Sequence, residues 1–164
     1  MRYWFDTEFI EDGKTIDLLS IGMVCEDGRE LYLENSDADW SKASDWVHEN
    51  VLPKLAGPRE PGTWLPRKHI AEDILNFIGD DKPEFWAYYA DYDWVVFCQL
   101  FGRMIDLPEG WPKFCMDLKQ LIKSKGDPKV MKMSDDAAHN ALSDALWCKI
   151  IWHDMQSIGH SDGT

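Results

Sequence analysis

The first 35 residues have the hydrophobic pattern of three short strands. The segments 2–9, 15–28 and 29–35 are rich in aliphatic and aromatic residues, and the last of them alternates between apolar and polar positions. Turn residues separate them, with Glu-Asp-Gly-Lys after the first segment and a second Asp-Gly pair at the end of the second. Three strands joined by tight turns predict an antiparallel meander.

Beyond the meander, helical and strand patterns alternate. Helical spacing of apolar residues occurs in 39–55, 67–79, 93–104 and 134–156, a buried strand pattern in 83–90, and a short strand followed by a helix in 113–126. We expect Asp39 or Ser41 to cap the first helix and Gly79 to end the second. The Pro- and Gly-rich segment 56–66 is expected to be a loop. This order predicts an α/β domain whose mixed sheet combines the meander with parallel strands and is flanked by helices.

Chain length and charge limit what the protein can bind. A length of 164 residues with 45% hydrophobic residues suits one domain with a real core. We expect this domain over residues 1–158, with 159–164 as a loose tail. The 17 basic and 30 acidic side chains give a net charge of −13, which argues against a protein that coats duplex DNA or an anionic membrane. Any contact with nucleic acid must therefore be local or bridged by metal ions.

Two further features predict a cytoplasmic protein that does not bind membranes. The N-terminus has early carboxylates instead of a basic and apolar leader, and no window approaches about 18 uncharged apolar residues. The four cysteines contain no Cys-x-x-Cys pair and no cysteine–histidine ligand spacing. We interpret them as reduced, mostly buried side chains, as is usual in a reducing cytoplasm.

Asp6 and Glu8 interrupt an otherwise apolar and aromatic strand. Side chains at positions i and i+2 of a strand point to the same face, so the two carboxylates lie side by side. Burying two like charges costs hydration and adds repulsion unless a cation lies between them. One interpretation is a divalent metal site, and the other is a frayed strand end that faces solvent.

More carboxylates fall where a predicted strand ends and a helix begins. Asp91, Tyr92 and Asp93 follow the strand segment 83–90. The carboxyl end of a strand is a common position for binding sites in α/β sheets. Alternatively, Asp91 or Asp93 serves only as a cap of the helix.

His139 and Asp144 form the third candidate pair. Five helical positions turn through about 500°, so the two side chains can meet only if His139 lies before the helix or in its first turn and Asp144 lies inside the helix. Asn140 is a suitable cap for such a helix. A histidine that reaches over a metal held by Asp144 is what a water-activating base requires. The alternative is an ordinary pair on the surface of a helix.

The order of these three groups resembles the motifs of the DEDDh group of 3′-5′ exonucleases. The Asp-x-Glu strand near the N-terminus, the Tyr-Asp pair that opens a helix near mid-chain and the His-x-x-x-x-Asp segment near the C-terminus follow that order over nearly the whole chain. Finer features, namely RYWFDTEFIEDG, LLSIGMV, DYDWVVFCQLFG and HNALSDA, resemble the bacterial and phage polyadenylate-specific exoribonuclease AS family. The resemblance implies a ribonuclease H-like fold, in agreement with the predicted order of elements.

The resemblance also assigns roles to individual residues. Four carboxylates correspond to the metal-binding set of the group, namely Asp6, Glu8, Asp93 and Asp144. His139 corresponds to the histidine that deprotonates the attacking water. Asp91 is the rival for the middle position, but Asp93 directly follows an aromatic residue and opens the apolar helix.

The chemistry of phosphodiester hydrolysis suits these residue types. Two divalent ions about 3.5–4 Å apart can activate a water and stabilise both the attacking and the leaving oxygen. Mg²⁺ and Mn²⁺ prefer carboxylate oxygens, so we expect two such ions per active site. We expect Asp6 to bridge both ions, Glu8 and Asp144 to complete one, and Asp93 to order either the second shell of ligands or a bound water. The expected reaction releases nucleoside 5′-monophosphates from the 3′ end of single-stranded RNA.

Substrate preference and assembly rest on the resemblance, which implies RNA, a preference for adenylate-rich ends and a homodimer. Phe9, Tyr92 and Trp94 lie close to the motifs and are candidates for stacking on bases. Phe9 stands where many members of the group have a small residue and then a Thr-Gly pair. Lys129 and Lys132 are candidates for holding the trailing phosphates.

Two other functions stay open at the level of the sequence. A 3′-5′ exonuclease of the same fold could act on single-stranded DNA, in proofreading or repair. An acidic protein with a net charge of −13 could instead mimic DNA and occupy a basic partner without any catalysis. Such a mimic would not need His139 and would spread its charge along the surface.

Overall fold

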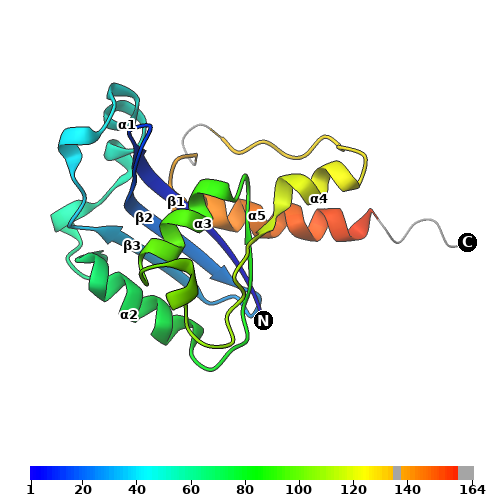
Figure 1. The fold of residues 1–164 in the computed structure, drawn as a ribbon. Helices are drawn as coiled ribbons and strands as arrows, with labels where there is room; N and C mark the ends of the chain where they lie inside the picture. Colours follow the sequence, from blue (N-terminus) through cyan, green and yellow to red (C-terminus); the bar gives the residue numbers. More distant parts are fainter. Residues whose placement is uncertain (135–137, 159–164) are drawn as a thin grey trace, which may run out of the picture.

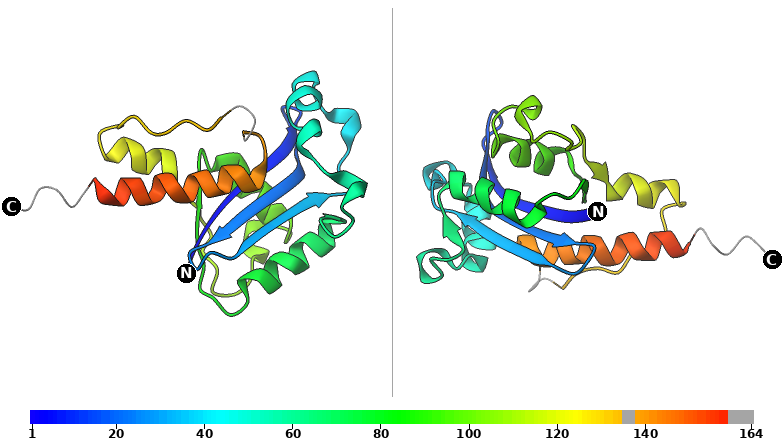
Figure 2. Two further views of the ribbon diagram at one scale, coloured as in Figure 1. Left: turned by 180° about the vertical axis from the view of Figure 1, so that it is seen from behind. Right: turned by 90° about the horizontal axis from the view of Figure 1, so that it is seen from below.

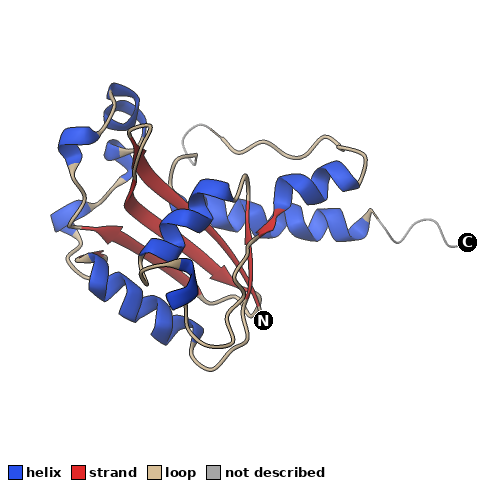
Figure 3. Cartoon of the chain, viewed as in Figure 1, coloured by secondary structure: helices blue, strands red, loops and turns tan. Residues whose placement is uncertain are grey.

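Within the residues that the structure describes, six strands form one mixed sheet in the order β4-β3-β2-β1-β5-β6. The computed structural model describes residues 1–134 and 138–158. The strands are β1 (Arg2–Glu11), β2 (Ile16–Cys25), β3 (Glu30–Asn35), β4 (Trp64–Leu65), β5 (Glu84–Ala87) and β6 (Met116–Asp117). The α-helices are α1 (Asp45–Asn50), α2 (Arg67–Ile78), α3 (Asp91–Gln99), α4 (Leu118–Ser124) and α5 (Ala141–Ser157). Figures 1 and 3 show the strands as one layer between helices, which confirms the expected α/β class.

The pairing of the strands agrees with the predicted meander. β1 pairs with β2 and β2 with β3, both antiparallel, whereas β5 runs parallel to β1 and β6 parallel to β5. The short β4 adds a parallel pairing at the outer edge of β3. The register between β1 and β2 shifts between Glu8 and Phe9, so a bulge lies directly after the Asp-x-Glu segment.

The two faces of the sheet carry separate hydrophobic cores. Because side chains alternate along β1, Tyr3 and Phe5 pack on the face covered by α2 and α3, and Trp4 packs on the face covered by α5 (Figure 2). On that second face, Trp4 and Trp86 contact Trp152 of α5 edge to face, and α4 lies alongside α5. Asp6, two residues after Trp4, therefore points toward α5.

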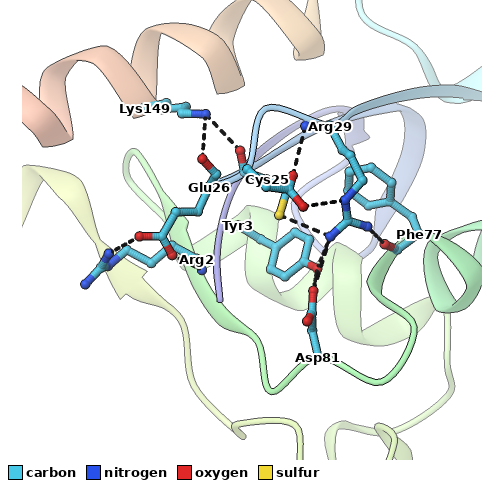
Figure 4. Close-up of polar contacts among 9 residues, drawn as sticks. Arg2, Tyr3, Cys25, Glu26, Arg29, Phe77, Asp81 and Lys149 are labelled. Atoms are coloured by element: carbon cyan, nitrogen blue, oxygen red, sulfur yellow. Dashed lines mark hydrogen bonds and ion pairs between the residues drawn. The ribbon is translucent and has the colours of Figure 1, made fainter.

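Polar contacts fix α5 and the start of β1 at the end of the sheet away from Glu8 (Figure 4). The Lys149 ammonium on α5 donates a hydrogen bond of 2.8 Å to the carbonyl oxygen of Cys25, the last residue of β2. The Tyr3 hydroxyl donates to Asp81 at 2.5 Å, and Arg29 donates to the same carboxylate at 3.2 Å. These bonds hold α5 against the end of β2 and hold β1 against the segment that follows α2.

The segment 39–55 differs from the single helix that its spacing predicts. The chain forms a 3-10 turn η1 (Trp40–Lys42), then α1, then a second turn η2 (Leu52–Lys54). Ala43 adopts an extended conformation, and the Ser44 hydroxyl accepts a hydrogen bond from the Val47 amide and so starts a new helix. Two local caps therefore override a continuous apolar stripe.

Other helix ends agree with the sequence or are displaced by a few residues. Asp39 caps η1, and Gly79 ends α2 with a positive φ of 59°. α3 begins at Asp91 and has Ala90 at its cap position, so neither Asp91 nor Asp93 is the cap. α5 begins at Ala141 with Asn140 as its cap, whereas the apolar spacing begins at 134.

Residues 135–137 and the predicted loose tail 159–164 lie outside the described residues. Two short 3-10 turns, η3 (Gly57–Arg59) and η4 (Met104–Asp106), complete the connections.

The four cysteines are free thiols, as expected. Among the helices in 1–134 and 138–158, none has the length and apolar character needed to cross a membrane.

Candidate active site

Three of the predicted carboxylates meet at one point. Asp6 and Glu8 point from β1 toward the first turn of α5, which carries Asp144, and one oxygen from each lies within 4.8 Å of the others. All three side chains are half-buried. Gly22 faces Asp6 across the β1–β2 pair, and its missing side chain leaves room for the backbone of Ala141. This close approach of α5 to the sheet brings Asp144 to Asp6.

Asp93 joins the group from the opposite side of β1. It lies in the first turn of α3, is 5% exposed, and accepts hydrogen bonds from the Thr7 amide at 2.9 Å and the Thr7 hydroxyl at 2.6 Å. Thr7 stands between the two β1 carboxylates, so these bonds hold Asp93 beside them. Asp91, its rival in the sequence, is exposed and lines a different hollow.

His139 precedes the helix that carries Asp144, which is one of the two placements that the spacing allows. The Asn140 side chain accepts a hydrogen bond from the Ser143 amide at 3.1 Å and starts α5 directly after the histidine. His139 has a φ of 63°, a left-handed conformation that few residues other than glycine adopt. Its ring meets Trp46 of α1 edge to face, with ring centroids 4.9 Å apart. The start of α5 and the contact with Trp46 together position the imidazole.

Burial, with added repulsion at Asp6, Glu8 and Asp93, raises the pKa values of the carboxylates. Burial raises the pKa of Asp6 well above its usual range, and the charges of Asp93, Asp144 and Glu8 raise it further. Burial, followed by repulsion from Asp144 and Asp93, raises the pKa of Glu8 to about 8. Burial raises the pKa of Asp93 to about 6 although the bonds from Thr7 oppose the change. Burial also raises the pKa of Asp144. A group of oxygen ligands under such repulsion fits a divalent cation, which would stabilise the ionised forms.

A pocket of about 300 Å³ brings these groups together. Its walls include all five expected catalytic residues and two of the three stacking candidates, and the full set is Asp6, Thr7, Glu8, Phe9, Tyr88, Tyr89, Tyr92, Asp93, His139 and Asp144. We call it the His139 pocket. The rings of Phe9 and Tyr92 meet edge to face across it, with centroids 5.8 Å apart.

Trp94 lies apart from this pocket. Its ring stacks on Phe97 at a centroid distance of 5.4 Å and also packs on Phe85, in the core beneath α3. In a helix that starts at Asp91, positions 92 and 94 face different directions, so Tyr92 reaches the pocket and Trp94 does not.

Four residues of the site were missed in the sequence, namely Thr7, Gly22, Trp46 and Tyr88. A glycine inside an apolar strand signals a close backbone approach, which identifies Gly22. The position of Thr7 between the motif acids is a weaker signal. Nothing in the local pattern connects Trp46 with His139, which lie in segments far apart in the chain.

Comparisons with known proteins identify the family of the chain. The family model of the 3′-5′ exoribonuclease Rv2179c-like domain matches residues 1–156. Two 3′-5′ exoribonucleases of Mycobacterium tuberculosis, from strains CDC 1551 and H37Rv, are each 45% identical to the chain over 148 residues, which is 88% of this chain and 87% of each relative.

A solved structure of exonuclease I superposes on 98% of the chain with a TM-score of 0.57 at 14% identity, and the match spans 41% of that longer protein. Exonuclease I has a ribonuclease H-like fold, so this likeness confirms the expected fold. The family match over residues 1–156 is more specific. The chain therefore belongs to the family of 3′-5′ exoribonuclease Rv2179c-like domains and is an enzyme of that family.

Proposed function

We propose that the chain is a metal-dependent 3′-5′ exoribonuclease of the DEDDh type. It shortens single-stranded RNA from the 3′ end and releases nucleoside 5′-monophosphates. The observation that carries the proposal is the meeting of Asp6, Glu8 and Asp144 within 4.8 Å, in the same pocket as Asp93 and His139. Membership of an exoribonuclease family supports the direction of cleavage and the substrate.

The donor set suits two hard divalent ions, Mg²⁺ or Mn²⁺. Asp6, Glu8 and Asp144 would hold them, and Asp93, fixed by Thr7, would orient a bound water. When bound, such ions supply positive charge that stabilises the attacking and leaving oxygens of a phosphodiester. The carboxylates then stay ionised near neutral pH, although burial and repulsion otherwise favour their protonated forms.

His139 serves as the general base in this proposal. The imidazole takes a proton from the attacking water, whose oxygen forms the new bond to phosphorus while the bond from phosphorus to the 3′-oxygen of the preceding nucleotide breaks. The leaving 3′-oxygen receives a proton from solvent. The contact with Trp46 orients the ring for this step.

In this proposal the terminal base stacks against the aromatic pair Phe9 and Tyr92. Both aromatic rings line the His139 pocket, and aromatic faces stack on bases of any sequence. The choice of RNA over DNA needs contacts to the 2′-hydroxyl. A preference for adenylate and membership of the narrower AS family rest on the resemblance of the sequence motifs.

A DNA mimic is a poor match for this geometry. A mimic needs ionised carboxylates spread over a surface. Burial and repulsion raise the pKa values of Asp6 and Glu8, which favours their uncharged forms. Expectations of a homodimer, a cytoplasmic location and one domain over 1–158 stay predictions. Sedimentation of the purified chain measures the first of them.

The substrate is tested with 5′-labelled single-stranded oligomers of equal length: A-rich RNA, mixed RNA and the matched DNA. With Mg²⁺ the proposal predicts a ladder that shortens from the 3′ end, fastest on A-rich RNA, with nucleoside 5′-monophosphates as products. Asp6→Asn, which keeps the shape of the side chain, should give no ladder. Faster loss of DNA would move the function to DNA processing, and no loss of any oligomer by folded protein would refute the enzyme.

A further inference from the structure

A second cavity adjoins the His139 pocket and has a different character. It measures about 520 Å³ and shares Asp6, Asp144 and Tyr88 with the first, so the carboxylates lie in the wall between the two. His139 and Phe9 do not line it. We call it the Trp147 pocket, after the α5 side chain on its wall, and its other defining residues are Lys129, Met131, Lys132 and Met133.

The segment 129–133, which follows α4, forms one side of the Trp147 pocket. It runs back along α5 (Figure 2), and the Trp147 indole donates a hydrogen bond of 2.8 Å to the carbonyl oxygen of Met131. The Tyr88 ring meets Trp147 edge to face at a centroid distance of 5.0 Å. The pocket thus has aromatic and thioether walls, while two lysines stand exposed at its edge.

The direction of the reaction decides which part of a substrate this pocket faces. In an in-line displacement the attacking water and the leaving oxygen lie on opposite sides of the phosphorus. His139, as the base, must lie on the side of the water. The leaving 3′-oxygen, and the strand attached to it, therefore lie away from His139. His139 comes before Asp144 at the start of α5 and Trp147 comes after it along the helix, so the Trp147 pocket extends from the carboxylates in the direction away from His139.

The chemistry of the Trp147 pocket suits that strand. Aromatic side chains stack on single-stranded bases, and lysines pair with the phosphates that follow. Lys129 and Lys132 give positive charge to the edge of this cavity in a chain whose net charge is −13. A purely apolar ligand would gain nothing from the two lysines.

We propose that the Trp147 pocket holds the penultimate nucleoside of the RNA, on the 5′ side of the bond that is cut, and that Lys129 and Lys132 hold the phosphates upstream of it. This assignment rests on the proposed 3′-5′ exonuclease activity. It gives the enzyme contacts with the part of the strand that stays bound after each cut.

The test uses A-rich RNA with one abasic nucleotide, placed either at the penultimate position or at the fifth position from the 3′ end. With the native chain the penultimate change should raise KM about 10-fold, the effect of losing one stacked base, and the distal change should matter little. In Trp147→Leu the penultimate penalty should shrink to about 2-fold or less. Met131→Ser, an exposed change that leaves the helix intact, should also reduce it and serves if Trp147→Leu does not fold.

The lysines are tested by the salt dependence of KM on intact RNA. Each lost phosphate contact lowers the slope of log KM against log salt by about 0.7, so Lys129→Gln with Lys132→Gln should lower it by about 1.4. The matched control is Lys82→Gln with Lys123→Gln, two exposed lysines that line neither pocket, and its slope should equal that of the native chain.

The outcomes separate this assignment from the proposed function. Equal abasic penalties in the native chain and both pocket variants, or equal salt slopes in the two lysine pairs, would refute the Trp147 pocket as the upstream site while leaving the exonuclease in place. An RNA that the native chain does not shorten at all would refute the exonuclease itself.

Discussion

Gly22 of β2 lies against the backbone of Ala141, the first residue of α5. A Cβ atom placed on Gly22 would lie closer than 3.0 Å to backbone atoms of Ala141 and Leu142, a separation that real Cβ atoms essentially never show. Gly22 also pairs with Asp6 across the sheet, and Asp144 lies three residues after Ala141. The glycine therefore sets the distance between Asp6 on β1 and Asp144 on α5.

Gly22→Ala should push the first turn of α5 away from the sheet. We expect Mg²⁺ affinity to fall at least 10-fold. The free energy of unfolding should drop by about 1–3 kcal/mol, because the added methyl group meets backbone atoms, which cannot move aside as a side chain can. Calorimetric titration with Mg²⁺ and thermal unfolding measure both. Gly62→Ala is the control, since a methyl group there meets open space. Native metal affinity in Gly22→Ala would contradict the role of this contact.

The raised pKa values of the carboxylates predict how stability depends on pH. The folded chain holds protons on Glu8 up to about pH 8, whereas the ordinary pKa of a glutamate is 4.5, so the folded state binds more protons in this interval. Stability without metal should be highest near pH 5 and should fall as the pH rises toward 8. Added Mg²⁺ should restore it at pH 8.

Melting temperatures between pH 5 and 8.5, with chelator and with Mg²⁺, measure this linkage. Glu8→Gln should flatten the curve in chelator, because the neutral amide carries no proton to lose. A melting temperature that rises steadily from pH 5 to 8 in chelator would contradict the repulsion among the four carboxylates.

Substitutions of His139 and Trp46 should distinguish the general base from the residue that positions it. His139→Ala is expected to lower kcat by about 10²–10⁴, the usual contribution of such a base, while Mg²⁺ affinity stays close to native. Trp46→Ala should lower kcat less, without a matching change in KM, and Trp46→Phe should restore most of it by keeping an aromatic edge. The exposed His69→Ala is the control. Unchanged kcat in His139→Ala would exclude it as the base.

Thr7 should set the ionisation of Asp93. Its hydroxyl donates the shorter of two bonds to the Asp93 carboxylate, so Thr7→Val should raise the pKa of Asp93 above about 6. The pH at which half of the maximal activity is reached should move upward, and Thr7→Ser, which keeps the hydroxyl, should behave as native. A pH–rate profile shows the difference. Identical profiles for the native chain and both variants would show that Thr7 does not set the ionisation of Asp93.

Much of the site could be predicted because its elements are local. The spacing of Asp6 and Glu8 fixes their common face in any strand, and the cap at Asn140 fixes the relation of His139 to Asp144 in any helix. The choice between Asp91 and Asp93 also followed the sequence, since only Asp93 reaches the Thr7 backbone.

The rest depends on contacts between distant segments. Trp94 was expected beside the substrate, but the start of α3 at Asp91 turns its ring onto Phe97 in the core. The close approach of Ala141 to Gly22 and the edge contact of Trp46 with His139 join residues more than 90 positions apart. No local propensity encodes such pairs, and the break within 39–55 arose from caps that compete with periodicity.

The most direct test is a titration of metal-free protein with Mn²⁺ in the presence of one 5′-labelled A-rich RNA, with metal binding and 3′ shortening followed in the same samples. The proposed two-ion mechanism predicts two bound ions per chain, no shortening in chelator, and activity that rises with metal occupancy in the native chain. Asp6→Asn should bind fewer ions and stay inactive. Shortening of the RNA at full rate in chelator, or native metal binding by Asp6→Asn, would contradict it.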